Sequence, residues 1–249
     1  ITDAASVDGV IKSTAPDAVI HCAAYTAVDA AEENVEACRK VNADGPRNIA
    51  KACRELDIKM IYISTDYVFN GQGENIWETE DECAPRSVYG QTKYEGELAV
   101  KELLDKYFIV RIAWVFGLNG KNFVKTMLKL SETNDTIGVV MDQVGTPTSA
   151  AELAKAVKYL LPTDNYGLFH GTCEGDTNWA EFAKTVLKLA GKKTEIEPIT
   201  TEEYKRRFPA SADRPAYSIL ENYMLKLTTD FTFAGWQDAI EVYMKELGL

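Results

Sequence analysis

The sequence predicts an α/β protein, namely a doubly wound, Rossmann-like parallel sheet with a smaller C-terminal lobe that binds substrate. Short apolar runs alternate with longer amphipathic segments through the first two thirds of the chain. The segments between these runs are long enough to cross over a sheet, as parallel strands require. The last third is more helical and more irregular, which indicates a separate lobe.

The expected strands are short runs of apolar and β-branched residues, as in strands buried on both faces. They lie at 17–24, 59–69, 107–117, 136–142 and 167–172. A further edge strand is expected at 194–200, because Pro198 fits an edge position.

The expected helices carry apolar residues at spacings of three and four. They lie at 28–56, 87–106, 122–130, 149–161 and 178–191. Gly45-Pro46 interrupts the first of them, so a kink or a new helix start is expected there. Gly191 is the expected C-terminal cap of the last one. The glycine-rich, acidic loop at 70–87 is long enough to be either functional or mobile.

We expect the dinucleotide-binding domain to comprise residues 1–118 and about 145–172, and the substrate lobe to comprise about 119–144 and 173–249. No G-x-x-G-x-x-G or G-x-G-x-x-G motif follows an expected strand, and the chain starts abruptly at Ile1. The expectation is therefore an N-terminally truncated Rossmann-like fold, whose pyrophosphate-binding turn lies upstream. Such a fragment is expected to bind cofactor poorly on its own, which titration of NADPH against residues 1–249 and against the full-length protein tests.

Composition and charge exclude several classes of function. The net charge of -11 and the pI near 4.8 argue against a nucleic-acid partner. No apolar run approaches the length of about 20 residues that spans a bilayer, and no export signal begins the chain. Five cysteines without a C-x-x-C pair, and two histidines in strand-like runs, predict no metal site and a reducing, cytoplasmic location.

Tyr89 and Lys93 form the first candidate catalytic pair, in "SVYGQTKY". Four residues apart on a helix they share one face, where an ammonium lowers the pKa of a phenol. A tyrosine tuned in this way can exchange a proton with a substrate oxygen near neutral pH. With 12 tyrosines in the chain, about one such pair is expected by chance, so a surface tyrosine packed on a lysine stem explains the spacing equally well.

Other candidate residues follow the ends of expected strands, where open α/β sheets bind ligands. Ser64, Thr65 and Asp66 end one strand, either to bind a substrate oxygen or to cap a turn. Small residues at 23–24 precede Tyr25, either for close approach of a flat ligand or for packing.

Two more candidates lie farther along the chain. Trp114 either stacks on a ligand ring or belongs to the core. Arg214 in "DRPAYS" either holds a phosphate or forms a surface salt bridge. Each signal is weak, but four of them follow successive strand ends in order.

In this order the motifs resemble the extended short-chain dehydrogenase/reductase superfamily, and more closely the dTDP-4-dehydrorhamnose reductase family. The stretches that carry the resemblance span nearly the whole chain: "VIHCAAYTAVDAAE", "VNADGPRNIAKAC", "YISTDYVFNG", "SVYGQTKYEGE", "RIAWVFG", "NFVKTML", "DQVGTPTSAAELA" and "SADRPAYS". "STDYVF" and "AAYTAVD" favour this family over the sugar epimerases and dehydratases of the superfamily.

The resemblance implies hydride transfer from NADPH or NADH to C4 of a nucleotide-linked 4-keto-6-deoxysugar in dTDP-rhamnose biosynthesis. It implies that Tyr89 protonates the C4 oxygen, that Lys93 binds the nicotinamide ribose and tunes Tyr89, and that Thr65 bonds near the reacting oxygen. The implied cofactor-binding residues are Ile1, Ala24, Tyr25, Thr26, Ile63, Tyr89 and Lys93. The implied substrate-binding residues are Thr65, Asp66, Trp114, Asn122, Gln143 and Arg214.

Two alternatives stay open at the level of sequence. One is another nucleotide-sugar epimerase or reductase. The other is a non-catalytic partner similar to the regulatory subunit of methionine adenosyltransferase. Sequence alone leaves open the choice between NADPH and NADH, the base and sugar, a homodimeric assembly and a need for Mg²⁺.

Overall fold

The centre of the molecule is a four-stranded sheet in the computed structural model, which describes residues 1–249. Its order is β1 (Ala18–His21), β2 (Lys59–Thr65), β3 (Tyr107–Ile112) and β8 (Gly167–His170), and all three pairings are parallel. The predicted parallel sheet is confirmed. In the register of β2 with β3, Thr65 pairs with Ile112, so both strands end at the same edge of the sheet.

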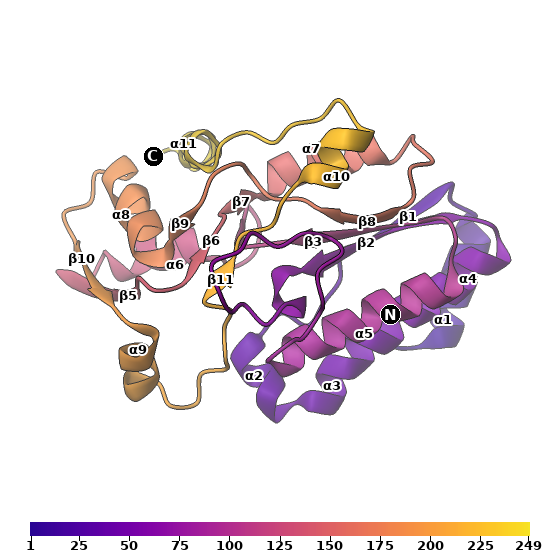
Figure 1. Cartoon of the computed structure of the whole chain (residues 1–249), viewed down its shortest axis with the longest axis horizontal. Coiled ribbons are helices and arrows are strands. Elements are labelled where there is room, and N and C mark those ends of the chain that lie inside the picture. Colours follow the sequence, from indigo (N-terminus) through magenta and orange to yellow (C-terminus); the bar gives the residue numbers. More distant parts are fainter.

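Helices cover both faces of this sheet (Figure 1). One face is covered by α1 (Ala4–Thr14), α4 (Gly45–Glu55) and α5 (Val88–Leu103), and the other by α7 (Ala150–Leu160), α10 (Tyr223–Thr228) and α11 (Trp236–Glu246). Alternate residues of β2 serve the two cores, because successive strand side chains point to opposite faces. Met60 and Tyr62 pack with Ile49 beside α4, whereas Ile61 packs with Phe169 in the larger core.

The region expected to be helical from 28 to 56 is divided into shorter pieces. These are α2 (Val28–Glu33), α3 (Val35–Arg39), a π-helical turn (Lys40–Asp44) and α4. The new helix start at Gly45-Pro46 is confirmed, since proline has no N–H to leave unpaired in a first turn. The π-helical turn has no signal in the hydrophobic spacing and was not predicted.

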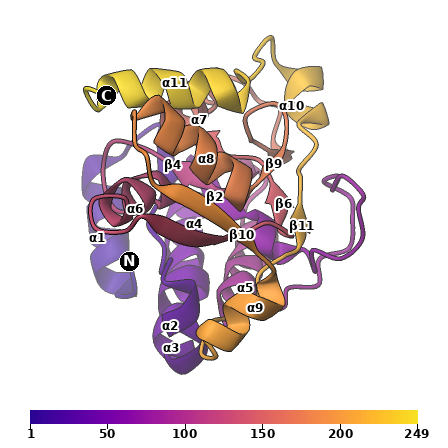
Figure 2. The same ribbon diagram turned by 90° about the vertical axis from the view of Figure 1, so that its left-hand side faces the viewer.

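A smaller layer lies beside the central sheet and contains most of the short elements (Figures 1 and 2). Here β5 (Thr136–Val140) pairs in parallel with β10 (Glu195–Ile199), next to α6 (Phe123–Leu130), α8 (Trp179–Leu189) and α9 (Thr201–Arg207). Short ladders join β4 (Val115–Phe116) to β7 (Thr148–Ser149), and β6 (Val144–Gly145) to β9 (Thr177–Asn178) and β11 (Tyr217–Ser218). The predicted edge strand near Pro198 is confirmed, and the predicted domain limits stay a prediction.

The strands are shorter in the structure than in the sequence pattern, and for two of them the backbone shows why. β2 ends at Thr65, because the next three residues form a 3₁₀ turn. The expected strand 107–117 is split into β3 and β4 by Trp114, whose φ of 48° lies in the left-handed region. Gly191 ends α8 as expected, with a φ of 63°. No helix has the length and apolar character that a bilayer crossing needs.

Candidate active site

Thr65 and Asp66 are buried together at the carboxyl end of β2, with 4% and 2% of their surface exposed. The Thr65 hydroxyl donates to Asp66 Oδ1 at 3.0 Å and accepts from the backbone N–H of Tyr67 at 3.3 Å. The threonine therefore caps the 3₁₀ turn, and its hydroxyl lies near the phenol of Tyr89. The second oxygen of Asp66 has no hydrogen-bond partner.

Tyr89 lies in the first turn of α5, at the same edge of the sheet. Ser87 caps this helix by accepting from the N–H of Gly90 at 3.1 Å, which fixes where the turn begins. The Tyr89 ring packs edge to face on Tyr67 at 5.3 Å between centroids. Burial raises the pKa of the Tyr89 phenol to about 12, and the neighbouring Thr65 hydroxyl opposes this.

Lys93 follows one turn later on the same face of α5, and only 2% of it is exposed. Its Nζ donates to the carbonyl of Ile63 at 2.6 Å and lies 4.0 Å from the centre of the Tyr62 ring. Burial lowers the pKa of Lys93 to about 7, against the opposing charge of Glu97. Burial dominates the pKa of Tyr89 here, and the Lys93 ammonium bonds to the Ile63 carbonyl of β2. That Lys93 lowers the pKa of Tyr89 stays a prediction.

A buried ion pair lies behind Lys93, and sequence analysis missed it. Glu97 accepts from Arg111 Nε at 3.0 Å, from Arg111 Nη2 at 2.8 Å and from the Ser64 hydroxyl at 2.5 Å. Arg111 also donates to Cys83 Sγ at 3.1 Å, in the loop that precedes α5. The available signals were the i, i+4, i+8 spacing of Tyr89, Lys93 and Glu97 on one helix face, and an arginine inside an apolar strand.

The expected cofactor loop follows β1 and is partly open to solvent. Ala24 and Tyr25 are half-buried and Thr26 is exposed. Asn42 holds this loop from the π-helical turn, since its side chain accepts from Tyr25 N at 2.8 Å and donates to Tyr25 O at 3.1 Å. Sequence analysis did not single out Asn42, because the contact joins segments 17 residues apart through a side chain.

The residues around this loop lie where open parallel sheets bind their ligands. The loop follows a parallel strand at its carboxyl end, with small residues first, and the buried Lys93 lies beside the neighbouring strand. Ile1 is 41% exposed, accepts at its carbonyl from Asn48 at 3.1 Å, and packs its side chain against Gly45.

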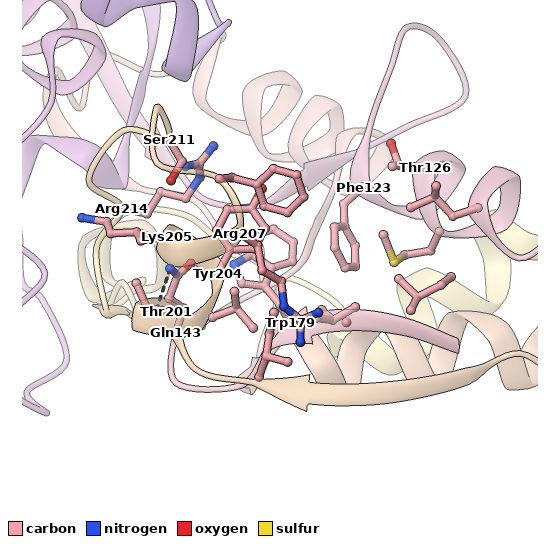
Figure 3. Close-up of a pocket in the computed structure, with 18 of the residues that line it drawn as sticks. Phe123, Thr126, Gln143, Trp179, Thr201, Tyr204, Lys205, Arg207, Ser211 and Arg214 are labelled. Carbon is pink, nitrogen blue, oxygen red and sulfur yellow. Dashed lines mark hydrogen bonds between the residues drawn. The ribbon is translucent and has the colours of Figure 1, made fainter. Parts of the chain in front are cut away.

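A cavity of about 540 Å³ lies between α6, β5, β10 and α9 (Figure 3). Its lining includes the predicted residues Gln143 and Arg214, and Gln143 donates to the Thr201 hydroxyl at 3.1 Å. Three cationic side chains line it and no carboxylate does, although the protein is strongly acidic; the cations are Lys205, Arg207 and Arg214. Each cation instead pairs with an acid outside the lining, as Arg214 does with Asp29 of α2 at 2.9 Å.

The other predicted substrate residues lie outside the lining of this cavity. Asn122 caps α6 by accepting from Lys125 N at 3.0 Å and donates to Gly117 O at 2.8 Å, so the fold already uses its side chain. Trp114 stacks on Trp179, which does line the cavity. No group of three or more His, Cys, Asp or Glu side chains is placed to hold a metal ion.

Asp66→Asn is expected to raise the free energy of unfolding at pH 7.5 and to leave it nearly unchanged at pH 4. Burial raises the pKa of Asp66 from 3.8 to about 6. Between pH 3.8 and 6 the native state therefore keeps a proton that the unfolded state has released. This proton stabilises the native state fully below pH 3.8, and the stabilisation is lost as the pH rises through 6. The expected gain at pH 7.5 is at most about 3 kcal/mol.

Urea unfolding of both proteins at the two pH values measures this difference. Asp105→Asn is the matched control, because Asp105 is exposed. A gain that is equal at both pH values would contradict the assigned pKa.

Comparison with known proteins agrees with these motifs. The family model described as the RmlD substrate binding domain matches residues 1–249. A dTDP-4-dehydrorhamnose reductase of Sinorhizobium fredii is 38% identical over 240 residues, which cover 92% of this chain and 80% of that protein. That of Escherichia coli is 35% identical over 248 residues, which cover 95% of this chain and 82% of that protein.

Solved structures of the same kind superpose closely on the chain. A dTDP-4-dehydrorhamnose reductase from Clostridium acetobutylicum matches with a TM-score of 0.95 and 44% identity, over 100% of this chain and 87% of that one. The one from Bacillus anthracis, solved in complex with NADP, matches with a TM-score of 0.94 and 41% identity, over 98% of this chain and 86% of that one. The chain therefore belongs to the dTDP-4-dehydrorhamnose reductase family.

Proposed function

We propose that the protein reduces dTDP-4-dehydro-rhamnose to dTDP-rhamnose, with NADPH or NADH as hydride donor and Tyr89 as proton donor. The observation that carries this proposal is the meeting of Thr65, Tyr89 and Lys93 at one edge of the parallel sheet, beside the open loop after β1. The bound nicotinamide would supply the hydride.

The side chains of this edge can manage the charge that develops during reduction. Hydride addition to a carbonyl carbon leaves negative charge on the oxygen, which hydrogen-bond donors stabilise. Thr65 and Tyr89 bring two neighbouring hydroxyl groups to this edge. An alkoxide is more basic than the phenolate of Tyr89, because the pKa of the Tyr89 phenol is about 12. Transfer of the Tyr89 proton to the alkoxide oxygen is therefore favourable.

Lys93 is proposed to hold the nicotinamide ribose, and Ala24, Tyr25, Thr26 and Ile63 to line the cofactor. The support is positional. Asn42 fixes the backbone of Tyr25, and Lys93 bonds the carbonyl of Ile63. The proposed place of Ile1 beside the adenine rests on the family resemblance alone.

The cavity is proposed to hold the nucleotide part of the substrate. A nucleoside diphosphate presents a flat base and a dense negative charge. Phe123 and Tyr204 give the cavity an aromatic lining, Gln143 gives it an amide, and its three cations face no carboxylate within it. Trp114 and Asp66 are proposed to contact the sugar, between the cavity and Tyr89. Asn122 is proposed to act on the substrate only through the start of α6.

Arg214→Ala is expected to raise the KM for the nucleotide sugar about 10–100-fold, because hydrogen bonds to charged groups contribute about 1.5–3 kcal/mol. The kcat should change little, since Arg214 is proposed to contact only the non-reacting part of the substrate. Steady-state kinetics checks this, with Arg206→Ala as the control, because Arg206 is exposed on α9 and outside the cavity lining. Equal effects of the two variants would contradict a phosphate-binding role for Arg214.

The proposed activity is tested by NADPH oxidation with dTDP-4-dehydro-rhamnose and identification of the sugar product. An epimerase would interconvert nucleotide sugars without net consumption of NADPH, and a regulatory subunit would show no turnover. The five free thiols support a reducing compartment, which we propose to be the cytoplasm. A homodimer stays a prediction, which light scattering of the purified protein tests.

A further inference from the structure

Trp114 adopts a backbone conformation that a bulky residue rarely takes. It lies between β3 and β4 with a φ of 48°. Such a conformation persists only when the surrounding structure enforces it, and it is concentrated at functional sites. The residues around the Trp114 indole therefore hold this conformation in place.

Two residues enclose this indole. Trp179 stacks on it with 3.5 Å between ring centroids and 9° between ring planes. At Gly145, a Cβ would lie 2.6 Å from Trp114 Cε2 and 2.8 Å from Nε1, so no side chain fits there without displacing the ring. Aromatic pairs prefer offset or edge-to-face arrangements, and the fold imposes this nearly eclipsed one.

One short ladder fixes both enclosing residues. In the antiparallel pairing of β6 with β9, Gly145 pairs with Thr177 and Val144 pairs with Asn178. Asn178 then caps α8 by accepting from Glu181 N at 2.9 Å, and Trp179 is the first residue of that helix. The position of Gly145 is thereby coupled to that of Trp179.

Trp179 also borders the large cavity, where its ring lies 4.5 Å from that of Phe123 (Figure 3). The stacked pair thus extends from the cavity wall to the carboxyl end of β3. A rigid ring at that end can orient a bound sugar, and orientation contributes strongly to catalysis.

We propose that Trp179 and Gly145 form an indole clamp, which holds the Trp114 ring in the orientation that positions the sugar. Trp179 is a positioning residue that acts through Trp114, and Gly145 provides the space that the ring needs. This inference rests on the proposed function, because it assigns a means of positioning to the same site.

A double-mutant cycle of Trp114→Ala and Trp179→Ala tests the clamp. We expect each single variant to raise the KM for dTDP-4-dehydro-rhamnose about 10-fold, and the double variant to be no worse than Trp114→Ala. Inhibition by dTDP, which lacks the 4-keto-6-deoxysugar, should change less than 3-fold, on the order of 0.6 kcal/mol. Trp179→Phe should restore most of the affinity, because a ring still stacks on Trp114.

Additive effects on KM, with an equal loss of dTDP affinity, would overturn the proposal. Trp179 would then be an independent wall of the cavity. Gly145→Ala gives a second test, since it should impair the wild type more than the Trp114→Ala background, where only the Ser218 hydroxyl, 2.8 Å from the added methyl group, still has to turn away.

Near-ultraviolet circular dichroism separates failure of the clamp from failure of the proposed function. The chain has four tryptophans. Trp114→Phe and Trp179→Phe should each remove the same part of the spectrum, because the signal comes from the stacked pair. Trp77→Phe should remove a different part, whether or not the pair is intact. Absence of turnover in a wild type that keeps this pattern would reject the function and not the clamp. If Trp114→Phe and Trp179→Phe removed different parts of the spectrum, the clamp would be rejected whatever the activity of the protein.

Discussion

Tyr89→Phe is expected to lower kcat about 1,000-fold, within the range of 100 to 10,000 that general acid catalysis contributes. The substitution removes only the hydroxyl group, so the edge-to-face packing on Tyr67 and the Ser87 cap of α5 are kept. Binding of the cofactor and the free energy of unfolding should therefore stay close to those of the wild type. Stopped-flow or steady-state NADPH oxidation measures kcat, and cofactor titration measures binding.

Tyr94→Phe is the matched control for this substitution. Tyr94 lies on the same helix and packs on another apolar cluster, beside Trp77 and Cys83. We expect its kcat to remain within 3-fold of the wild type. If Tyr89→Phe were as active as Tyr94→Phe, proton donation would have to come from another group.

Glu97→Gln is expected to lower the free energy of unfolding by about 3–5 kcal/mol, because it leaves the charge of Arg111 buried without a partner. Glu97 and Arg111 have 0% and 1% of their side chains exposed. Urea unfolding measures the loss. Glu95→Gln is the control, because its ion pair with Arg39 lies at the surface, with 28% and 47% of the two side chains exposed, and surface pairs contribute about 0–1 kcal/mol.

The double variant Glu97→Leu with Arg111→Met should be more stable than Glu97→Gln alone. Apolar replacement of both partners leaves no unpaired Arg111 charge in the core, although Ser64 loses its acceptor and Lys93 loses the opposing charge of Glu97. A loss under 1 kcal/mol for Glu97→Gln would show that the pair does not anchor α5 to β3, the strand that carries Arg111.

The edge of the sheet where the site lies was predictable from the sequence, because apolar strand runs and the residues after them are local patterns. Thr65 was singled out in this way, whereas Tyr89 was chosen from its spacing to Lys93 and Arg214 from a proline-flanked loop. Their roles stay predictions. Asn122 shows the limit of such patterns. An asparagine before an apolar helix is an N-cap signal as much as a ligand signal, and the structure uses Asn122 as the cap.

The parts that sequence did not predict depend on contacts between distant segments. Lys93 shares a helix face with Tyr89, but the direction of its ammonium is set by the Ile63 carbonyl on the neighbouring strand. Stacking of Trp114 on Trp179 joins residues from two separate elements. No spacing rule reports such contacts, since they arise from how the layers pack.

The most direct test of the account uses NADPH carrying deuterium at the position of the transferred hydride. The purified protein is incubated with this cofactor and dTDP-4-dehydro-rhamnose, and the product is analysed by mass spectrometry and NMR. We predict dTDP-rhamnose with one deuterium at C4, formed by the wild type and by Tyr94→Phe but only slowly by Tyr89→Phe. A sugar product without deuterium at C4, or no conversion by the wild type, would contradict the proposed hydride transfer.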